Sequence, residues 1–193
     1  MIELLTPSDY RKMRWKNGAG YTLELARSAG EDLAEFDWRI SMADVTTSGA
    51  FSPFNGMQRI LTVLEGEGLA LQVDGKSHTL RSLQSLPFSG ASAVSCELLA
   101  GPIRDFNLIY QPERYAARYQ WIVSHQTSEF LSSADILFIF NSSSEVLDIR
   151  IEGELFQLEQ QHSLYLHSHQ NVKHLLFPSS RLRQCCLIEL TKI

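Results

Sequence analysis

Arg59 is the residue whose type and position point most directly to chemistry. It opens the stretch 59–65, whose β-branched and apolar residues predict a strand. A guanidinium is permanently charged and presents a planar fork of donors, which suits a carboxylate. If Arg59 points into the protein, its charge needs a partner, because an unpaired buried charge is costly. That partner is either Glu65, in a structural ion pair, or the carboxylate of a ligand.

Arg39 is a second arginine on a predicted strand, which covers residues 36–45. Pocket arginines and arginines of structural ion pairs look alike in a sequence. Arg39 is therefore expected either to contact the ligand or to pair with one of the nearby acids, which are Asp37, Asp44 and Glu24.

Glu24 and Thr22 share one face of the predicted strand 21–27, so both could face a pocket. A carboxylate in such a place could act as a general base. If the protein is an enzyme, Glu24 and Glu65 are the candidate catalytic residues.

Aromatic and amide side chains flank these charged residues. Phe51, Phe54 and Phe88 are expected either to form the rim of a pocket or to pack at the end of a barrel. Asn107 follows Phe106, so it lies on the polar face of its strand, either toward a pocket or toward solvent. Asn17 belongs to a turn rich in glycine, where it either bonds the turn's own backbone or contacts the ligand.

Several histidines occur late in the chain. His167 and His169 would lie on one face of a strand at the spacing of metal ligands, and His174 could join them from the next strand. The alternative is a polar surface loop, since residues 163–171 are rich in serine, histidine and glutamine and contain no carboxylate. We expect no metal and no other cofactor.

The elements that must position these residues are short strands. The stretch 59–65, a turn over Gly66-Glu67-Gly68 and the stretch 69–73 form a predicted hairpin. Many such stretches at a spacing of about ten residues predict an all-β barrel or sandwich. No helix of ten residues is predicted, although residues 127–133 could form a short one.

Two barrels explain the 193 residues better than one, because the second half has the same density of strands and turns as the first. The best boundary is the Gln-Pro-Glu turn at 111–113. We therefore expect a first barrel over residues 1–112 and a smaller second one over 113–193, with an exchange of strands between them left open.

Composition excludes several classes of protein. The formal net charge is -5 without a basic block, which argues against direct binding of nucleic acid. No apolar run reaches the length of a membrane span. The three cysteines include the neighbours Cys185 and Cys186, which are expected to be reduced, one in the core and one on the surface. A soluble cytoplasmic protein is the simplest interpretation.

Several segments between Trp15 and Leu108 resemble, in the same order, the motifs of the HutD/Ves family of cupins. Ala19 stands where that family often has glycine, and residues 113–193 carry no motif that matches. The segments are Trp-Lys-Asn-Gly-Ala-Gly-Tyr-Thr-Leu-Glu at 15–24, Phe-Asp-Trp-Arg-Ile-Ser-Met-Ala at 36–43, Gly-Ala-Phe-Ser-Pro-Phe-Asn-Gly-Met-Gln-Arg at 49–59, Leu-Pro-Phe at 86–88 and Asp-Phe-Asn-Leu at 105–108.

The resemblance implies a bacterial bicupin, with two barrels of the RmlC-like jelly-roll type in one chain and no catalytic metal. Metal-binding cupins carry His-x-His and a glutamate around their first hairpin. Here Met57, Gln58 and Arg59 stand in that region, and no histidine precedes His78. One branch of the family is encoded with histidine-degradation genes and is thought to restrain their expression, and the other is linked to stress responses.

The expected function is therefore non-catalytic binding of a small carboxylate, such as urocanate or formiminoglutamate, in histidine utilisation or a stress response. One alternative is a metal-independent isomerase or epimerase that acts on a small acid. Another is a structural scaffold for dimerisation, and a homodimer is among the assemblies that the sequence allows. An acid with a raised pKa beside Arg59 would favour the enzyme. An apolar outer strand face would favour the scaffold.

Overall fold

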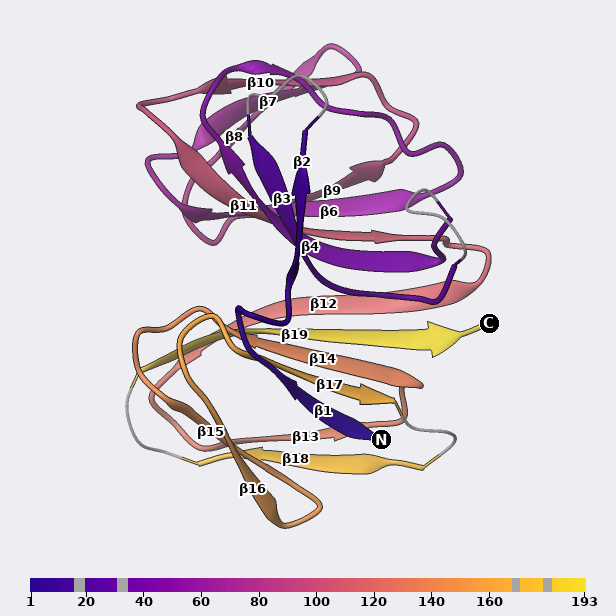
Figure 1. Ribbon diagram of the computed structural model, residues 1–193, viewed down its shortest axis with the longest axis vertical. Helices are drawn as coiled ribbons and strands as arrows, with labels where there is room; N and C mark the ends of the chain where they lie inside the picture. The colour runs from indigo at the N-terminus through magenta and orange to yellow at the C-terminus, as the bar shows by residue number, and fades with distance from the viewer. Residues whose placement is uncertain (16–19, 31–34, 168–170, 179–181) are drawn as a thin grey trace. The chain divides into compact units, whose positions relative to one another are not determined.

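The computed structural model describes residues 1–15, 20–30, 35–167, 171–178 and 182–193. Every regular element among these residues is a β-strand (Figure 1), which confirms the prediction of an all-β fold. Within the described part of the chain, no helix is long and apolar enough to cross a membrane. The chain divides into two compact units, which we call the first barrel (Tyr10–Pro112) and the second barrel (Met1–Asp9 with Glu113–Ile193).

The first barrel consists of two sheets of antiparallel strands. One sheet has six strands in the order β2-β3-β4-β11-β6-β9, and the other has four in the order β5-β10-β7-β8. Its strands are β2 (Arg11–Arg14), β3 (Tyr21–Arg27), β4 (Trp38–Val45), β5 (Gly49–Ala50), β6 (Gln58–Glu65), β7 (Leu69–Val73), β8 (Lys76–Leu80), β9 (Ser85–Ser89), β10 (Val94–Leu98) and β11 (Ile103–Tyr110).

The predicted pairing of the stretches 59–65 and 69–73 as a hairpin is wrong, because β6 pairs with β11 and β9 whereas β7 pairs with β10 and β8 in the other sheet. The turn at 66–68 carries the chain from one sheet to the other, and it depends on glycine. Gly66 and Gly68 have φ angles of 93° and 109°, which other residues rarely adopt. A Cβ on Gly68 would also lie 2.2 Å from the carbonyl oxygen of Leu80. Both strands send apolar side chains into a core that includes Leu61, Val63, Leu69 and Leu71.

The second barrel repeats this arrangement with sheets of five strands (β1-β17-β14-β19-β12) and four strands (β13-β18-β15-β16). The hydrophobic core of the second barrel includes Leu137, Ile139, Ile149 and Leu175. The strands are β1 (Ile2–Leu5), β12 (Tyr115–Ser124), β13 (Ser128–Ser132), β14 (Ile136–Asn141), β15 (Leu147–Ile151), β16 (Glu154–Leu158), β17 (Ser163–His167), β18 (Lys173–Phe177) and β19 (Arg183–Lys192).

Three sequence-based expectations are wrong in the second barrel. Residues 1–9 do not belong to the first barrel, because β1 pairs with β17, which it flanks in Figure 1. The stretch 127–133 contains strand β13 rather than a short helix. Cys185 and Cys186 point to opposite faces of β19, yet both are fully buried, so neither is a surface residue.

Candidate functional site

The first barrel contains a cavity of about 660 Å³. Its floor is formed by the inward-facing side chains of neighbouring strands β4, β11 and β6. The segment 47–54 lies along one wall, and Cys96 reaches the cavity from the other sheet. This volume is in the range of small-molecule sites.

Strand register brings the two arginines into one row across the floor. Ile109 of β11 is opposite Arg39 of β4 on one side and opposite Arg59 of β6 on the other. All three side chains line the cavity. Asn107 lies two residues before Ile109 on β11, so it faces the same side of the sheet and also lines the cavity.

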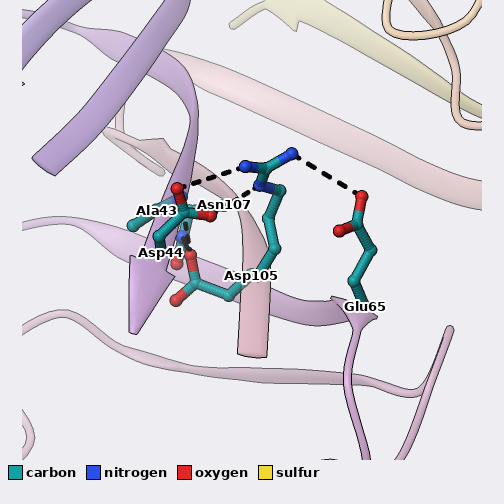
Figure 2. A network of polar contacts seen from close by, with 6 residues as sticks. Ala43, Asp44, Glu65, Asp105 and Asn107 are labelled. Atoms are coloured by element: carbon teal, nitrogen blue, oxygen red, sulfur yellow. Dashed lines mark hydrogen bonds and ion pairs between the residues drawn. The ribbon is translucent and has the colours of Figure 1, made fainter. Parts of the chain in front are cut away.

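Arg59 is buried and held by a chain of amide and carboxylate groups. Its Nε and Nη2 both donate to Oδ1 of Asn107, at 2.9 and 2.7 Å. Asn107 in turn donates from Nδ2 to Oδ1 of Asp105 at 2.8 Å, and this oxygen also accepts from the backbone nitrogen of Ala43 at 3.1 Å (Figure 2). Within the described ranges, Nη1 of Arg59 has no hydrogen-bond partner.

Aromatic rings cover the planar faces of the Arg59 guanidinium. Its central carbon lies 4.6 Å from the ring centre of Phe51 and 5.6 Å from that of Phe88. Such contacts stabilise the cation and fix its orientation. Phe51 lines the cavity, whereas Phe88 is a buried residue of the barrel core.

Burial changes the acid–base properties of this pair. Loss of hydration lowers the pKa of Arg59 to about 10, an effect that the charge of Asp105 opposes. Loss of hydration also raises the pKa of Asp105 to about 6, opposed by Arg59 and by the hydrogen bonds from Asn107 and Ala43. Arg59 therefore remains charged at neutral pH, and Asp105 changes its charge close to neutral pH.

Arg39 has a different environment. Its guanidinium carbon lies 4.8 and 5.1 Å from the ring centres of Phe36 and Phe54, and these two rings contact each other, with their centres 6.2 Å apart. Its Nε is buried and donates no hydrogen bond to the part of the chain that the structure describes. Burial lowers the pKa of Arg39, and the charge of Glu24 opposes this shift. Of the acids proposed as partners, Asp44 instead binds Arg104, at 2.6 Å.

The structure gathers most of the predicted ligand-binding residues around the cavity. Thr22 and Phe54 line it directly, and the Thr22 hydroxyl accepts a hydrogen bond of 2.9 Å from Trp15 Nε1. Glu24 is buried on β3, and its Oε2 has no hydrogen-bond partner among the described residues. Asn17 lies outside the described residues.

The predicted ion pair of Arg59 with Glu65 is wrong. Six residues along a strand span about 20 Å, so the two side chains cannot meet. The Glu65 side chain is 59% exposed and lies 3.6 Å from the guanidinium of Arg104, which also binds Asp44 (Figure 2). Glu65 is therefore not a catalytic candidate.

Asp105 is the functional residue that sequence reasoning missed. It lines the cavity but is only 1% exposed. Its Oδ2 forms no hydrogen bond with the described residues. Alternation places Asp105 on the same face as Asn107, but only the order of the strands, with β11 between β4 and β6, brings its carboxylate near Arg59.

The late histidines belong to the second barrel. His167 ends β17, His174 lies on β18 within 3.7 Å of Glu129, and His169 is outside the described residues. In the described ranges, no three side chains of histidine, cysteine, aspartate or glutamate gather closely enough to hold a metal ion.

Known proteins that are similar to this chain identify its family. The sequence profile of the HutD family matches residues 7–184. The chain belongs to the HutD family. It is 52% identical over 146 residues to a 21.2 kDa protein of Pseudomonas putida from the region 3' of hutC, covering 75% of this chain and 76% of that protein. Protein Ves of Escherichia fergusonii is 36% identical over 138 residues, 69% of this chain and 71% of Ves.

Solved structures agree with this family and with the predicted cupin fold. HutD of Pseudomonas fluorescens SBW25, determined in a formate condition, is 41% identical and superposes with a TM-score of 0.87 over the full length of both chains. Two more distant structures are also similar. A bacterial pirin of Escherichia coli is 12% identical with a TM-score of 0.69, and a salicylate 1,2-dioxygenase of Pseudoaminobacter salicylatoxidans is 9% identical with a TM-score of 0.66. At such identities the likeness concerns the fold alone. It confirms the expected cupin-type architecture, with two barrels in one chain.

Proposed function

We propose that this HutD-family protein binds a small carboxylate in the first barrel, with the free edge of Arg59 as its anchor. The observation that carries the proposal is that Asn107 binds only one edge of the Arg59 guanidinium. Asn107 accepts from Nε and Nη2 along one edge, so Nη1 and the second N–H of Nη2 remain for a ligand. A carboxylate matches that remaining pair of donors in a bidentate geometry.

The surroundings of Arg59 favour an anion. The only buried acid joined to it in the described structure is Asp105, through Asn107, and loss of hydration opposes full ionisation of that acid. Arg39 adds a second positive charge to the same cavity. A buried guanidinium whose charge is only partly compensated gains free energy when an anion enters.

Relatives narrow the class of carboxylate. The P. putida relative is named for the hutC region, which supports a role in histidine utilisation. Urocanate and formiminoglutamate are carboxylates of that pathway, and the planar urocanate chain could lie against Phe51 or Phe54. Binding without catalysis would let the protein report the level of such an acid, and the likeness to Ves keeps a stress response as the alternative setting.

Calorimetry with a panel of histidine-pathway acids tests the proposal. The Arg59→Lys variant keeps the charge but loses the fork of donors, so it should weaken binding by about 1–3 kcal/mol without loss of the fold. Arg81→Lys makes the same change at an exposed site and should bind like the wild type. The proposal is wrong if no acid binds the wild-type protein, or if Arg59→Lys binds as well as wild type.

Asp105 favours a second candidate function, a metal-independent isomerase or epimerase. A buried acid with a pKa of about 6 beside Arg59 is suited to proton transfer, and Oδ2 is the oxygen available to a ligand. Asp105 would take a proton from the carbon next to the bound carboxylate, and the protonated Asp105 would return it to the opposite face after the planar carbanion has rotated in the pocket. Incubation of each bound acid in D₂O, followed by NMR, detects this exchange. Deuterium incorporation that is lost in Asp105→Asn would establish the enzyme, and no incorporation by the wild type would exclude it.

A further inference from the structure

We infer that the natural ligand carries two anionic groups, with Arg59 binding one and Arg39 the other. This inference rests on the proposed carboxylate site and adds the chemical class of the ligand. It assigns Arg39 the role of a specificity-determining residue, which separates dicarboxylates from monocarboxylates.

The spacing of the two arginines is set by the sheet. Arg39 and Arg59 are both opposite Ile109, on the strands that flank β11. Neighbouring strands lie about 4.8 Å apart, so the two backbones are separated by about 10 Å. Both side chains reach the same cavity, so one small molecule can contact both.

Arg39 lacks the internal partner that Arg59 has. Asn107 binds two nitrogens of Arg59, whereas Arg39 has ring contacts and no hydrogen bond to any described residue, with its Nε buried. Glu24 acts on the Arg39 charge through space, but no ion pair within 4 Å joins the two in the described ranges. The Arg39 side chain is half-buried with its Nε fully buried, so an incoming anion stabilises its charge beyond what Glu24 supplies.

The segment 51–54 contacts both Arg59 and Arg39. Phe51 covers Arg59 and Phe54 covers Arg39, with only two residues between them. Backbone hydrogen bonds fix the segment, from Phe51 N to Val94 O at 2.9 Å and from Phe54 N to Gly90 O at 2.7 Å. The two anion positions are therefore held at a fixed spacing by a common wall.

The surface between the arginines is apolar. Ile109 separates them in the floor, and the two phenylalanine rings stand above them. A short hydrocarbon chain matches this strip, and the charged ends of the molecule match the two guanidinium groups. The geometry thus points to a short, flexible or planar dicarboxylate.

Calorimetry with succinate, glutarate and adipate, each against its own monoamide, tests the inference. A monoamide has nearly the size and shape of the diacid but only one negative charge. The wild-type protein should bind its best diacid at least tenfold more tightly than the matching monoamide. Arg39→Gln should remove that difference by weakening the diacid and should leave the monoamide within about twofold, whereas Arg59→Lys should weaken both ligands.

Two further variants make the result specific. Arg81→Gln removes one positive charge at an exposed site and should leave both affinities within about twofold. Arg39→Lys should keep a large part of the preference for the diacid. Equal wild-type affinity for diacid and monoamide overturns the inference and leaves the carboxylate site standing. Equal weakening of both ligands by Arg39→Gln also overturns it. No binding of either ligand to the wild type overturns this inference too, whereas the carboxylate site itself is decided by the panel of histidine-pathway acids.

Discussion

Asp105 is the side chain of the pocket whose charge is most sensitive near neutral pH. Its pKa is raised to about 6 because burial removes water from the carboxylate, and Arg59 offsets only part of that effect. The folded protein therefore binds more protons at this site than the unfolded chain between pH of about 4 and 6. Its contribution to stability is largest at low pH and is lost as the pH rises through about 6.

Asp105→Asn should reveal this dependence. The amide keeps the oxygen that accepts from Asn107 and Ala43 but cannot ionise. Between pH 4.5 and pH 7.5, the free energy of unfolding of the variant should gain about 1–3 kcal/mol relative to the wild type. Urea unfolding at the two pH values measures this difference. If the variant instead loses stability relative to the wild type between pH 4.5 and pH 7.5, Asp105 is a fully ionised partner of Arg59.

The segment that joins β5 to β6 is the element that gives the pocket its aromatic wall. Gly90 packs against it, and a Cβ there would lie 2.3 Å from the carbonyl oxygen of Phe54 and 3.0 Å from that of Met57. Both contacts are backbone atoms, so the segment would have to move.

Gly90→Ala should therefore destabilise the protein by about 1–3 kcal/mol and weaken ligand binding, because the rings on both arginines depend on this segment. Gly49→Ala is the matched control for stability, since a Cβ at Gly49 meets no atom within 4 Å. Urea unfolding of both variants and calorimetry on Gly90→Ala provide the measurement. Equal stability of the two variants would contradict this role of Gly90.

Alternation and turn residues in the sequence predict the strands well, but they do not predict which side chains meet across the sheet. Alternation on 36–45 and 103–110 places Arg39 and Asn107 on the cavity face. The glycines at 66 and 68 locate the turn between β6 and β7, but these two strands belong to different sheets and form no hairpin. The choice of Glu65 as partner for Arg59 failed because it ignored the length of the strand. Asp105 was missed because nothing in the sequence shows that β11 lies between β4 and β6, which is what brings its acid near Arg59.

On the scale of the whole molecule, the first strand belongs to the second barrel. β1 pairs with β17 over four residues, from Ile2 opposite Leu166 to Leu5 opposite Ser163. Such a pairing joins positions more than 150 residues apart and leaves no local signal in the sequence. The sequence-based boundary at 112 therefore could not assign residues 1–9 to the second barrel.

Deletion of residues 2–5 should expose the edge of β17 and lower the stability of the second barrel. Amide hydrogen exchange should become faster in β17 and its neighbour β14, and the carboxylate affinity of the first barrel should be unchanged. Mass spectrometry of exchange in the full chain and the deletion variant measures both regions at once. Faster exchange confined to the first barrel would contradict the assignment of β1.

The central claim is that Arg59 is the carboxylate anchor, and NMR of its guanidinium group tests it most directly. Protein labelled with ¹⁵N and ¹³C on arginine is titrated with formate, urocanate and formiminoglutamate, and the Arg59 signals are assigned by their absence in Arg59→Lys. At least one acid should shift the Arg59 Nη signals in a saturable way, with the same dissociation constant as calorimetry gives. Binding that leaves these signals unchanged, or no binding by any of the acids, would contradict the claim.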